Sequence, residues 1–286
     1  MPELPEVETV RRSLLPSLTG RRITSVALQA FPAVISGLDP ETFSALVTDR
    51  WVVGIRRRGK YLLIDLDDDS GFIVHLRMTG NLTVLSATTP AVRFEQIAFM
   101  LDDGQSLRFS DQRKFGRIEY RAADNRDPLE SKLGPEPLGR GFTSLYLISR
   151  LRNRTAPIKA LILDQRILAG VGNIYADEAL FRSRIHPLTP AGQLNASQIA
   201  SLVRSIKTVL RSGIAYRGTS FSSYRDGNGE AGSNQLHLRV YGRGRKGEPC
   251  LRCGHPLVTL TAGGRTSHVC LRCQPFFPET TSHFSN

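Results

Sequence analysis

The chain has 286 residues, 40% of them hydrophobic and 22% charged; the length is typical of about two globular domains, and the composition argues against disorder. No apolar run reaches the roughly 18 residues that a membrane-spanning helix needs, and the N-terminus MPELPEVETV has no hydrophobic signal segment, so an integral membrane protein is excluded and a cytoplasmic protein is expected. The formal charge is +12, and residues 141–286 hold 19 basic but only 7 acidic residues, so this half is expected to bind a polyanion.

The first 120 residues predict one helix followed by many short strands. Val7, Val10, Leu14 and Leu18 recur at helical spacing around Pro5, a residue suited to a first helical turn. The runs with strand-like composition are residues 23–28, 51–55, 61–66, 72–76, 82–85, 96–101, 106–110 and 117–120. Turns rich in Asp and Gly separate several of them. Consecutive short strands of this kind predict a β-sandwich or a barrel.

A Gly- and Pro-rich break at residues 133–141 separates this half from a helical one. Helices are predicted at residues 144–154, 156–163, 173–182 and 197–215, and a small hairpin at 258–260 and 266–269. The glycine-containing turn at 168–173 leads into a helix, so its N–H groups could hold a phosphate, or it could be an ordinary helix connection. Residues 219–235 are rich in Ser, Gly and Asn, which predicts a mobile loop.

All four cysteines lie near the C-terminus, in two pairs. They are Cys250, Cys253, Cys270 and Cys273, with two residues inside each pair and sixteen between the pairs. This spacing predicts one zinc ion held by four thiolates; the alternative is two disulfides, which would need an oxidising compartment. A closed four-thiolate site is structural, so the ion would fold the module and do no chemistry. His255 and His268 lie close to these pairs and are expected at the surface.

Three segments resemble the formamidopyrimidine-DNA glycosylase family, also called Fpg or MutM. They are PELPEVET at residues 2–9, GVGNIYADEALF at 170–181 and VYGRGRKGEPC at 240–250. The similarity runs in order along nearly the whole chain, to about residue 274. The related endonuclease VIII branch opens with PEGPE, so Leu4 favours the Fpg branch.

The resemblance implies an α+β multidomain fold. Residues 1–134 would form a catalytic β-sandwich with a leading helix, and residues 135–143 a linker. Residues 144–239 would form a helix-two-turn-helix domain with a loop that caps the lesion, and residues 240–274 the zinc finger. Residues 275–286 extend beyond the usual end of the family and are expected to form a disordered tail.

The resemblance also assigns catalytic roles. Removal of Met1 would leave Pro2 with a secondary α-amine. Because an α-amine titrates at about pH 8, a fraction of it is neutral at pH 7. Such an amine can attack C1′ of the sugar to form an iminium, which promotes elimination of both flanking phosphates. Glu3 corresponds to the general acid/base, Glu6 to a supporting carboxylate, and Lys60 to the lysine of the catalytic centre. From the residues alone, Glu3 and Glu6 could instead cap the helix, and Lys60 would be a solvated strand end.

Extrusion of a nucleotide leaves a gap in the duplex, which the family fills with side chains. The corresponding residues are Met78, Arg113 and Phe115. By pattern alone, Met78 and Phe115 would be core residues. The family positions that contact phosphates correspond to Lys159, Asn173 and Arg265.

Three residues of the gap-filling loops depart from the family pattern. Arg77 stands where the family usually has a glycine, and Gln112 and Lys114 replace a common Pro and Arg. These changes are expected to alter the backbone freedom of both loops and with it the preference for the opposite base.

The sequence therefore predicts a bifunctional DNA glycosylase and abasic-site lyase of base excision repair. Its expected substrates are oxidised purines, chiefly 8-oxoguanine opposite cytosine and formamidopyrimidines, in double-stranded DNA. We expect a monomer with one structural zinc ion. The alternatives are an endonuclease VIII-like glycosylase for oxidised pyrimidines, a DNA-binding module without catalysis, and a zinc-ribbon RNA-binding protein.

Overall fold

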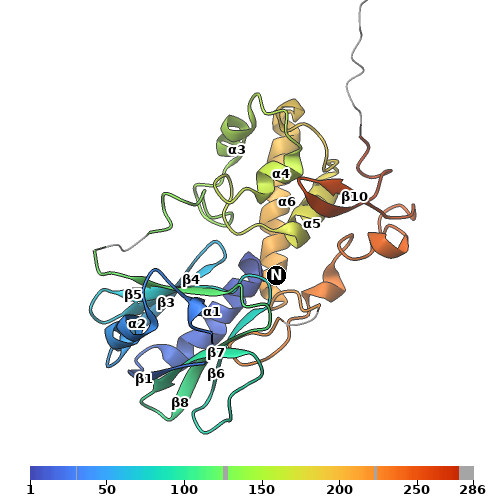
Figure 1. Ribbon diagram of the computed structural model, residues 1–286. Helices are drawn as coiled ribbons and strands as arrows, with labels where there is room; N and C mark the ends of the chain where they lie inside the picture. Colours follow the sequence, from blue (N-terminus) through green and yellow to red (C-terminus); the bar gives the residue numbers. More distant parts are fainter. Residues whose placement is uncertain (30, 125–127, 222–223, 277–286) are drawn as a thin grey trace, which may run out of the picture. The chain divides into compact units, whose positions relative to one another are not determined.

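The computed structural model describes residues 1–29, 31–124, 128–221 and 224–276 (Figure 1). The chain divides into two compact units. The N-terminal unit contains residues 1–134 and 211–237, and the C-terminal unit contains residues 135–210 and continues from residue 238. Of the expected tail, residues 277–286 lie outside the described part of the chain.

Two sheets and the helices that accompany them build the N-terminal unit. One sheet has the order β1-β7-β8-β6; the other has the order β2-β9-β5-β4-β3, in which β2 runs parallel to β9 and the other neighbours are antiparallel. The strands are β1 (Ile23–Leu28), β2 (Ile35–Ser36), β3 (Val52–Arg58), β4 (Tyr61–Leu66), β5 (Gly71–His75), β6 (Gly80–Ser86), β7 (Glu95–Leu101), β8 (Gln105–Asp111) and β9 (Arg117–Arg121). The predicted strands are confirmed with small shifts at their ends, whereas β2 was not predicted.

The leading helix, α1 (Leu4–Leu18), is fixed by its first residues and by its apolar face. The N–H of the N-cap residue Glu3 donates to the Glu6 carboxylate at 2.9 Å, and Pro5 lies in the first turn, where a missing N–H costs no helical bond. The predicted apolar residues of this helix are all buried, and α1 packs on β3, β4 and β6. The buried face of α1 therefore closes the apolar core of the sandwich.

The core of the sandwich is built around three phenylalanines. Phe72 of β5 stacks on Phe99 of β7 with ring centroids 5.0 Å apart, and Phe43 meets both rings edge-on. Phe43 belongs to α2 (Pro40–Val47), a helix that was not predicted although Asp39 followed by Pro is a standard helix start. Side chains of both sheets share this core, which confirms the predicted sandwich.

Helices and one hairpin build the C-terminal unit. The helices are α3 (Ser144–Leu151), α4 (Ile158–Leu163), α5 (Asn173–Ser183) and α6 (Ala196–Ala215), and the end of α6 continues into the N-terminal unit. The hairpin pairs β10 (Val258–Ala262) with β11 (Arg265–Val269). Its turn residue Gly263 has a positive φ, and a Cβ there would lie 2.9 Å from the Cα of Ala160. Glycine is therefore required where the hairpin turn meets α4.

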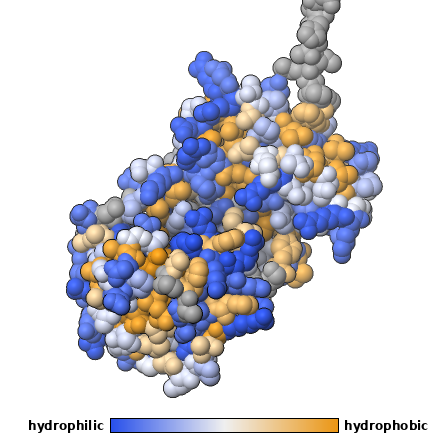
Figure 2. Space-filling view, in the orientation of Figure 1, coloured by the Kyte–Doolittle hydropathy of each residue, from blue (hydrophilic) through white to orange (hydrophobic). Residues whose placement is uncertain are grey.

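Short 3₁₀ turns complete the structure. They are η1 (Pro32–Val34), η2 (Ala191–Gln193), η3 (Asn234–His237) and η4 (Gly244–Lys246). None of the helices in the described part of the chain has both the length and the apolar character needed to cross a membrane. The face seen in Figure 2 carries broad hydrophilic areas with smaller apolar ones between them.

Candidate functional site

The start of α1 holds the predicted nucleophile and general acid/base. Pro2 lies directly before Glu3, the N-cap of the helix, and both residues are buried while Met1 is exposed. A helix N-terminus carries a partial positive charge, which disfavours a protonated amine. The position therefore favours the neutral, nucleophilic form of an amine at Pro2.

Glu6 connects the start of α1 to the segment that follows α6. Its Oε2 accepts from the N–H of Glu3 at 2.9 Å, and its Oε1 accepts from the N–H of Thr219 at 2.7 Å. The hydroxyl of Tyr224 donates to the backbone carbonyl of Glu6 at 3.1 Å. The capping interpretation of Glu6 is therefore confirmed, and the same side chain holds the segment predicted as a mobile, lesion-capping loop; residues 222–223 of that segment lie outside the described residues.

Lys60 lies in the turn between β3 and β4 and is 7% exposed, so the interpretation as a solvated strand end is wrong. Its neighbour Tyr61 packs edge-on against the ring of His75, with centroids 4.4 Å apart. Burial, reinforced by the positive charges of Arg77 and Lys60, lowers the pKa of His75 to about 3. The imidazole is therefore neutral at pH 7 and can accept a hydrogen bond beside a charged ammonium.

The three residues predicted to fill the gap in the duplex lie together at the surface. Met78 is 38% exposed and Phe115 is 48% exposed, so the interpretation of both as core residues is wrong. The Nη1 of Arg113 donates to the Met78 sulfur at 3.1 Å, and its guanidinium lies 4.9 Å from the centre of the Phe115 ring. Two loops far apart in the sequence thus present one cluster of side chains able to enter a base stack.

One buried carboxylate organises both loops. Asp111 is 1% exposed, and its Oδ2 accepts from the N–H groups of Phe115 (2.9 Å) and Gly116 (2.7 Å). Its Oδ1 accepts from the N–H of Arg113 at 3.1 Å and from the hydroxyl of Thr79, which follows Met78. Sequence reasoning missed Asp111, although a single acidic residue at the start of a loop is a common acceptor for loop N–H groups.

Two of the three departures from the family pattern occupy left-handed backbone. Arg77 has φ 53° and Lys114 has φ 58°, a region that is unfavourable by roughly 1–2 kcal/mol for a residue with a Cβ. The N–H of Arg77 donates to the neutral Nδ1 of His75 at 2.9 Å, and the Lys114 ammonium lies 5.0 Å from the centre of the Phe31 ring. Gln112 is exposed. Each loop therefore holds a strained residue directly before its exposed Met or Phe.

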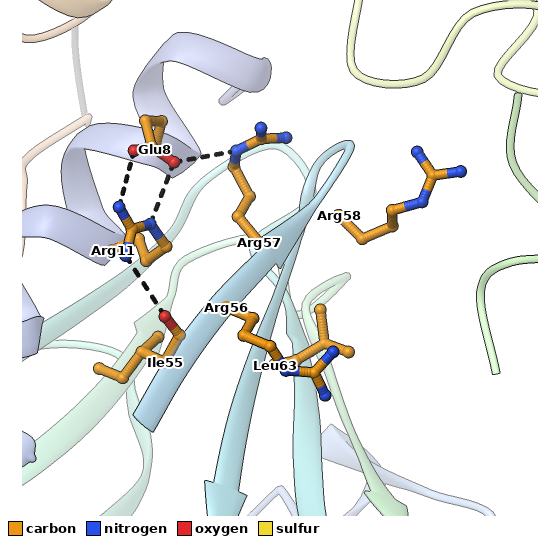
Figure 3. A pocket seen from close by; sticks show the side chains of 7 residues that line it. All are labelled: Glu8, Arg11, Ile55, Arg56, Arg57, Arg58 and Leu63. Atoms are coloured by element: carbon orange, nitrogen blue, oxygen red, sulfur yellow. Dashed lines mark hydrogen bonds and ion pairs between the residues drawn. The ribbon is translucent and has the colours of Figure 1, made fainter. Parts of the chain in front are cut away.

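A hollow of about 350 Å³ beside β3 is lined by Glu8 and four arginines, of which Arg11, Arg56 and Arg57 pair with carboxylates of the unit (Figure 3). Glu8 accepts from Arg11, Arg12 and Arg57 at 2.8–3.1 Å. Burial by itself raises the pKa of Glu8, but its bonds to these arginines lower it to about 2. Glu8 therefore stays ionised and fixes Arg57 near the turn that holds Lys60.

The predicted phosphate-contacting residues meet at the start of β11. The Nδ2 of Asn173, the first residue of α5, donates to the carbonyl of Thr266 at 2.9 Å, and the Nζ of Lys159 donates to the same carbonyl at 3.0 Å. Arg265, the residue before Thr266, is exposed. The structure therefore brings Lys159, Asn173 and Arg265 to one place in the C-terminal unit.

Lys159 is buried to 0% exposure, unlike the other two residues. Its ammonium forms an ion pair with Asp177 at 2.6 Å and donates to the hydroxyl of Ser267 at 2.7 Å. Burial raises the pKa of Asp177 to about 6, while the Lys159 charge and the N–H of His268 oppose that rise, so the carboxylate is ionised at neutral pH. A phosphate contact of Lys159 stays a prediction; the structure shows an ammonium that holds β11 to α4 and α5.

The four cysteine sulfurs converge at the other end of the hairpin. All lie within 4.8 Å of one another, with 3.9 Å between Cys250 and Cys273 and 3.5 Å between Cys253 and Cys270. A tetrahedral zinc ion with bonds of about 2.3 Å needs sulfurs roughly 3.8 Å apart, whereas a disulfide needs about 2.05 Å. The sulfurs therefore fit one structural Zn²⁺ and are not joined as disulfides.

The prediction for the two histidines near the zinc site is correct for His255, which is exposed, and wrong for His268. His268 is 3% exposed and its ring packs edge-on against Tyr241, with centroids 5.0 Å apart. Burial, followed by the charges of Arg245 and Lys159, lowers the pKa of His268 to about 4. The spacing of the cysteines gave no sign of this burial, which depends on α5 and on η4.

Comparison with known proteins covers nearly the whole chain. Residues 1–118 match the model of the formamidopyrimidine-DNA glycosylase N-terminal domain, residues 133–225 match the H2TH domain of that enzyme, and residues 247–275 match the zinc finger found in FPG and IleRS. The formamidopyrimidine-DNA glycosylase of Herpetosiphon aurantiacus is 48% identical over 274 residues, which are 96% of this chain and 100% of that protein.

Solved structures of Fpg proteins are also similar to this chain along nearly its whole length. The Fpg of Lactococcus lactis is 36% identical and matches 96% of this chain and 100% of its own. Its complexes contain DNA with an abasic site (TM-score 0.90), with Fapy-dG (0.88) and with an oxidised pyrimidine (0.89). The MutM (Fpg) protein of Thermus thermophilus is 39% identical, with a TM-score of 0.85 over 97% of this chain and 100% of that one.

Proposed function

The chain belongs to the formamidopyrimidine-DNA glycosylase family, and we propose that it is a bifunctional glycosylase and abasic-site lyase for oxidised purines in duplex DNA. Its substrates would be formamidopyrimidines and 8-oxoguanine opposite cytosine. The observation that carries the proposal is the buried pair Pro2 and Glu3 at the start of α1, in the same unit as Lys60 and the exposed gap-filling residues.

The proposed reaction begins after removal of Met1. The neutral amine of Pro2 attacks C1′, and the damaged base leaves with the bonding electrons and the proton that the Pro2 nitrogen gives up. Glu3 in its protonated form donates its proton to the sugar ring oxygen as the bond between that oxygen and C1′ breaks, and the nitrogen lone pair forms the iminium. The resulting iminium has no proton on nitrogen to lose, so it withdraws electrons from C2′. Loss of the C2′ proton then expels the 3′ phosphate, a second elimination expels the 5′ phosphate, and water releases the sugar fragment from Pro2.

The remaining residues would hold the DNA. Lys60 would contact phosphates at the lesion, and Met78, Arg113 and Phe115 would fill the space left by the extruded nucleotide, with Arg113 hydrogen-bonding the unpaired cytosine. The exposure of Met78 and Phe115 at the surface supports their role in filling this space. Of Lys159, Asn173 and Arg265, the exposed Arg265 is the side chain best placed to contact phosphates directly. We expect the enzyme to act as a monomer.

Borohydride trapping tests the proposal most directly. The protein is incubated with a duplex containing 8-oxoguanine opposite cytosine, and the reduced adduct is mapped by mass spectrometry. We expect a covalent complex through Pro2. An adduct through another residue would remove Pro2 from the mechanism, and no adduct with a processed N-terminus and bound zinc would favour a DNA-binding module.

Two variants separate the steps. Pro2→Gly should lose most strand cleavage, because a primary amine gives an imine that is less often charged than the iminium of proline. Glu3→Gln should stop base excision and leave lesion binding intact. The control is Glu41→Gln, which removes a carboxylate from the first turn of α2 in the same unit and should leave both activities unchanged.

A second candidate substrate class is oxidised pyrimidines. It is favoured by the Lactococcus lactis Fpg structure with an oxidised pyrimidine in its DNA. Excision rates on matched duplexes that differ only in the lesion will rank the two classes. Faster removal of oxidised pyrimidines than of 8-oxoguanine would assign the chain an endonuclease VIII-like specificity.

A further inference from the structure

The C-terminal unit contains a second basic site, at the end of α5 opposite to Asn173. A hollow of about 510 Å³ is lined by four arginines and three residues with hydroxyl groups. Arg182 and Arg184 lie at the C-terminal end of α5, Arg204 lies on α6, and Arg252 lies between the first two zinc-site cysteines. All four arginine side chains are exposed, so their charges are available to a ligand.

No carboxylate of the described residues pairs with these arginines. In the parts of the chain that the structure describes, no ion pair includes any of the four. The sequence explains this, because it has no acidic residue between Glu178 and Asp226 or between Glu248 and Glu279. Glu178 itself accepts hydrogen bonds from the backbone N–H groups of residues 239–241. Among the described residues of the unit, the four positive charges are therefore left without an acidic partner.

The hollow in the N-terminal unit differs, because a carboxylate, that of Glu8, lies in its lining (Figure 3). There Arg11 and Arg57 bond to Glu8, and Arg56 bonds to Asp65 at 2.6 and 2.8 Å. These three arginines serve the fold, since each has an acidic partner, and the fourth, Arg58, donates to the carbonyls of Leu133 and Gly134. A group of four arginines without such a partner is destabilised by mutual repulsion and gains stability when an anion binds.

The chemistry of the lining fits phosphate. Arg252 is held in place, because its Nη1 donates to the carbonyl of Phe181 at 3.1 Å and its guanidinium lies 4.3 Å from the centre of the Phe181 ring. Ser201 and Ser205 add hydroxyl groups along one face of α6, whereas the hydroxyl of Thr208 donates to the carbonyl of Arg204 at 2.9 Å. Guanidinium forks and hydroxyls together are typical phosphate ligands. The C-terminus of α5 supplies only about half a negative charge, which cannot balance four guanidiniums.

We propose that this hollow is a second phosphate-binding site, which holds the sugar-phosphate backbone of DNA outside the lesion site. The identity of the polyanion rests on the proposed function. Because α5 has 11 residues, its two ends are roughly 15 Å apart, so the hollow is separate from Asn173. The lining has no apolar side chain to anchor a protein partner, and this favours a phosphodiester backbone.

The test is the salt dependence of binding to undamaged duplex DNA of about 40 base pairs. Each phosphate contact contributes about 0.9 to the slope of log affinity against log salt, so R182Q/R204Q should lower that slope by about 1.8. Between about 50 and 200 mM salt, the wild-type protein should then lose roughly twelvefold more affinity than the variant. A slope equal to that of the wild type would overturn the proposal.

The control is R21Q/R22Q, which removes the same charge from arginines that pair with Asp103 and Asp49. Its slope should stay at the wild-type value. An equal fall in both variants would mean that net charge alone is responsible, and this would also overturn the proposal. The rate of single-turnover base excision from a short lesion duplex should remain within about twofold of the wild-type rate in both variants. If the proposed function is wrong, the wild-type protein itself will show no excision, and this outcome is distinct from a failure of the second site.

The source of the phosphate is resolved by stoichiometry. At low salt, the wild-type chain would bind two duplexes of about 12 base pairs if the site holds a second DNA segment, and the R182Q/R204Q chain would bind one. If both proteins bind one short duplex per chain and the slope changes only with the longer DNA, the site holds the part of the same duplex that flanks the lesion. Either result supports the proposal. Weaker inorganic phosphate binding in the variant without any slope change would indicate a small-anion site and overturn the DNA assignment.

Discussion

Replacing Asp111 with Asn should release both gap-filling loops, because this one buried carboxylate accepts from four donors on them. An amide oxygen can accept about two of these bonds, and the NH₂ group of Asn faces the remaining donors. Hydrogen bonds to a charged group contribute about 1.5–3 kcal/mol each, so loss of two should lower the free energy of unfolding by about 3–6 kcal/mol. The change is confined to the unit that holds Met78, Arg113 and Phe115.

Urea unfolding followed by the fluorescence of Trp51 measures this effect, because Trp51 is the single tryptophan of the chain and lies in the N-terminal unit. The control, Asp102→Asn, makes the same chemical change in an exposed turn and should shift stability by less than about 0.5 kcal/mol. Base excision by Asp111→Asn should also fall at least about tenfold at a temperature where the variant remains folded. Equal stability and equal excision in the two variants would refute the role of Asp111.

Three further predictions concern other buried groups. The unfolded imidazole of His75 binds a proton near pH 6.5 and the folded one only near 3, so its contribution to stability is complete above pH 6.5 and is lost as the pH falls toward 3. His75→Asn keeps an acceptor for the Arg77 N–H, and should reduce the stability lost between pH 7 and 5 by about 2 kcal/mol in urea unfolding; an unchanged acid loss would contradict this assignment. Lys159→Met should destabilise the C-terminal unit by about 3–5 kcal/mol in thermal unfolding, because it leaves the carboxyl group of Asp177 buried without its ion-pair partner, and Lys159→Met/Asp177→Leu should recover part of the loss; a double variant no better than the single one would argue against the ion pair. Cys250→Ser should remove zinc and weaken DNA binding while Trp51 reports unchanged unfolding of the N-terminal unit, and one zinc ion per chain in the purified variant would disprove the four-thiolate site.

The zinc site and the strands of the sandwich could be predicted from the sequence because their signals are local. The spacing of two Cys-x₂-Cys pairs is enough to identify the four zinc ligands. Short apolar runs separated by turn residues are enough to predict the strands. The helix α2 carries an equally local signal, Asp39 followed by Pro, and was missed because its apolar stripe is short. The motif at residues 2–9 likewise pointed to Pro2, Glu3 and Glu6 without any knowledge of packing.

Only the tertiary structure decided which of these side chains are buried and what they contact. The Glu6 carboxylate accepts a hydrogen bond from Thr219, more than two hundred residues away, and the Asp111 carboxylate accepts one from Thr79, which lies in another loop. No spacing in the sequence predicts either contact. Lys159 and His268 both look like surface residues in the sequence, yet each is buried because α4, α5 and β11 close around it. Residue type and spacing determine local structure and ligand sets, whereas the cost of burying a charge or a donor depends on partners that only the folded chain brings within reach.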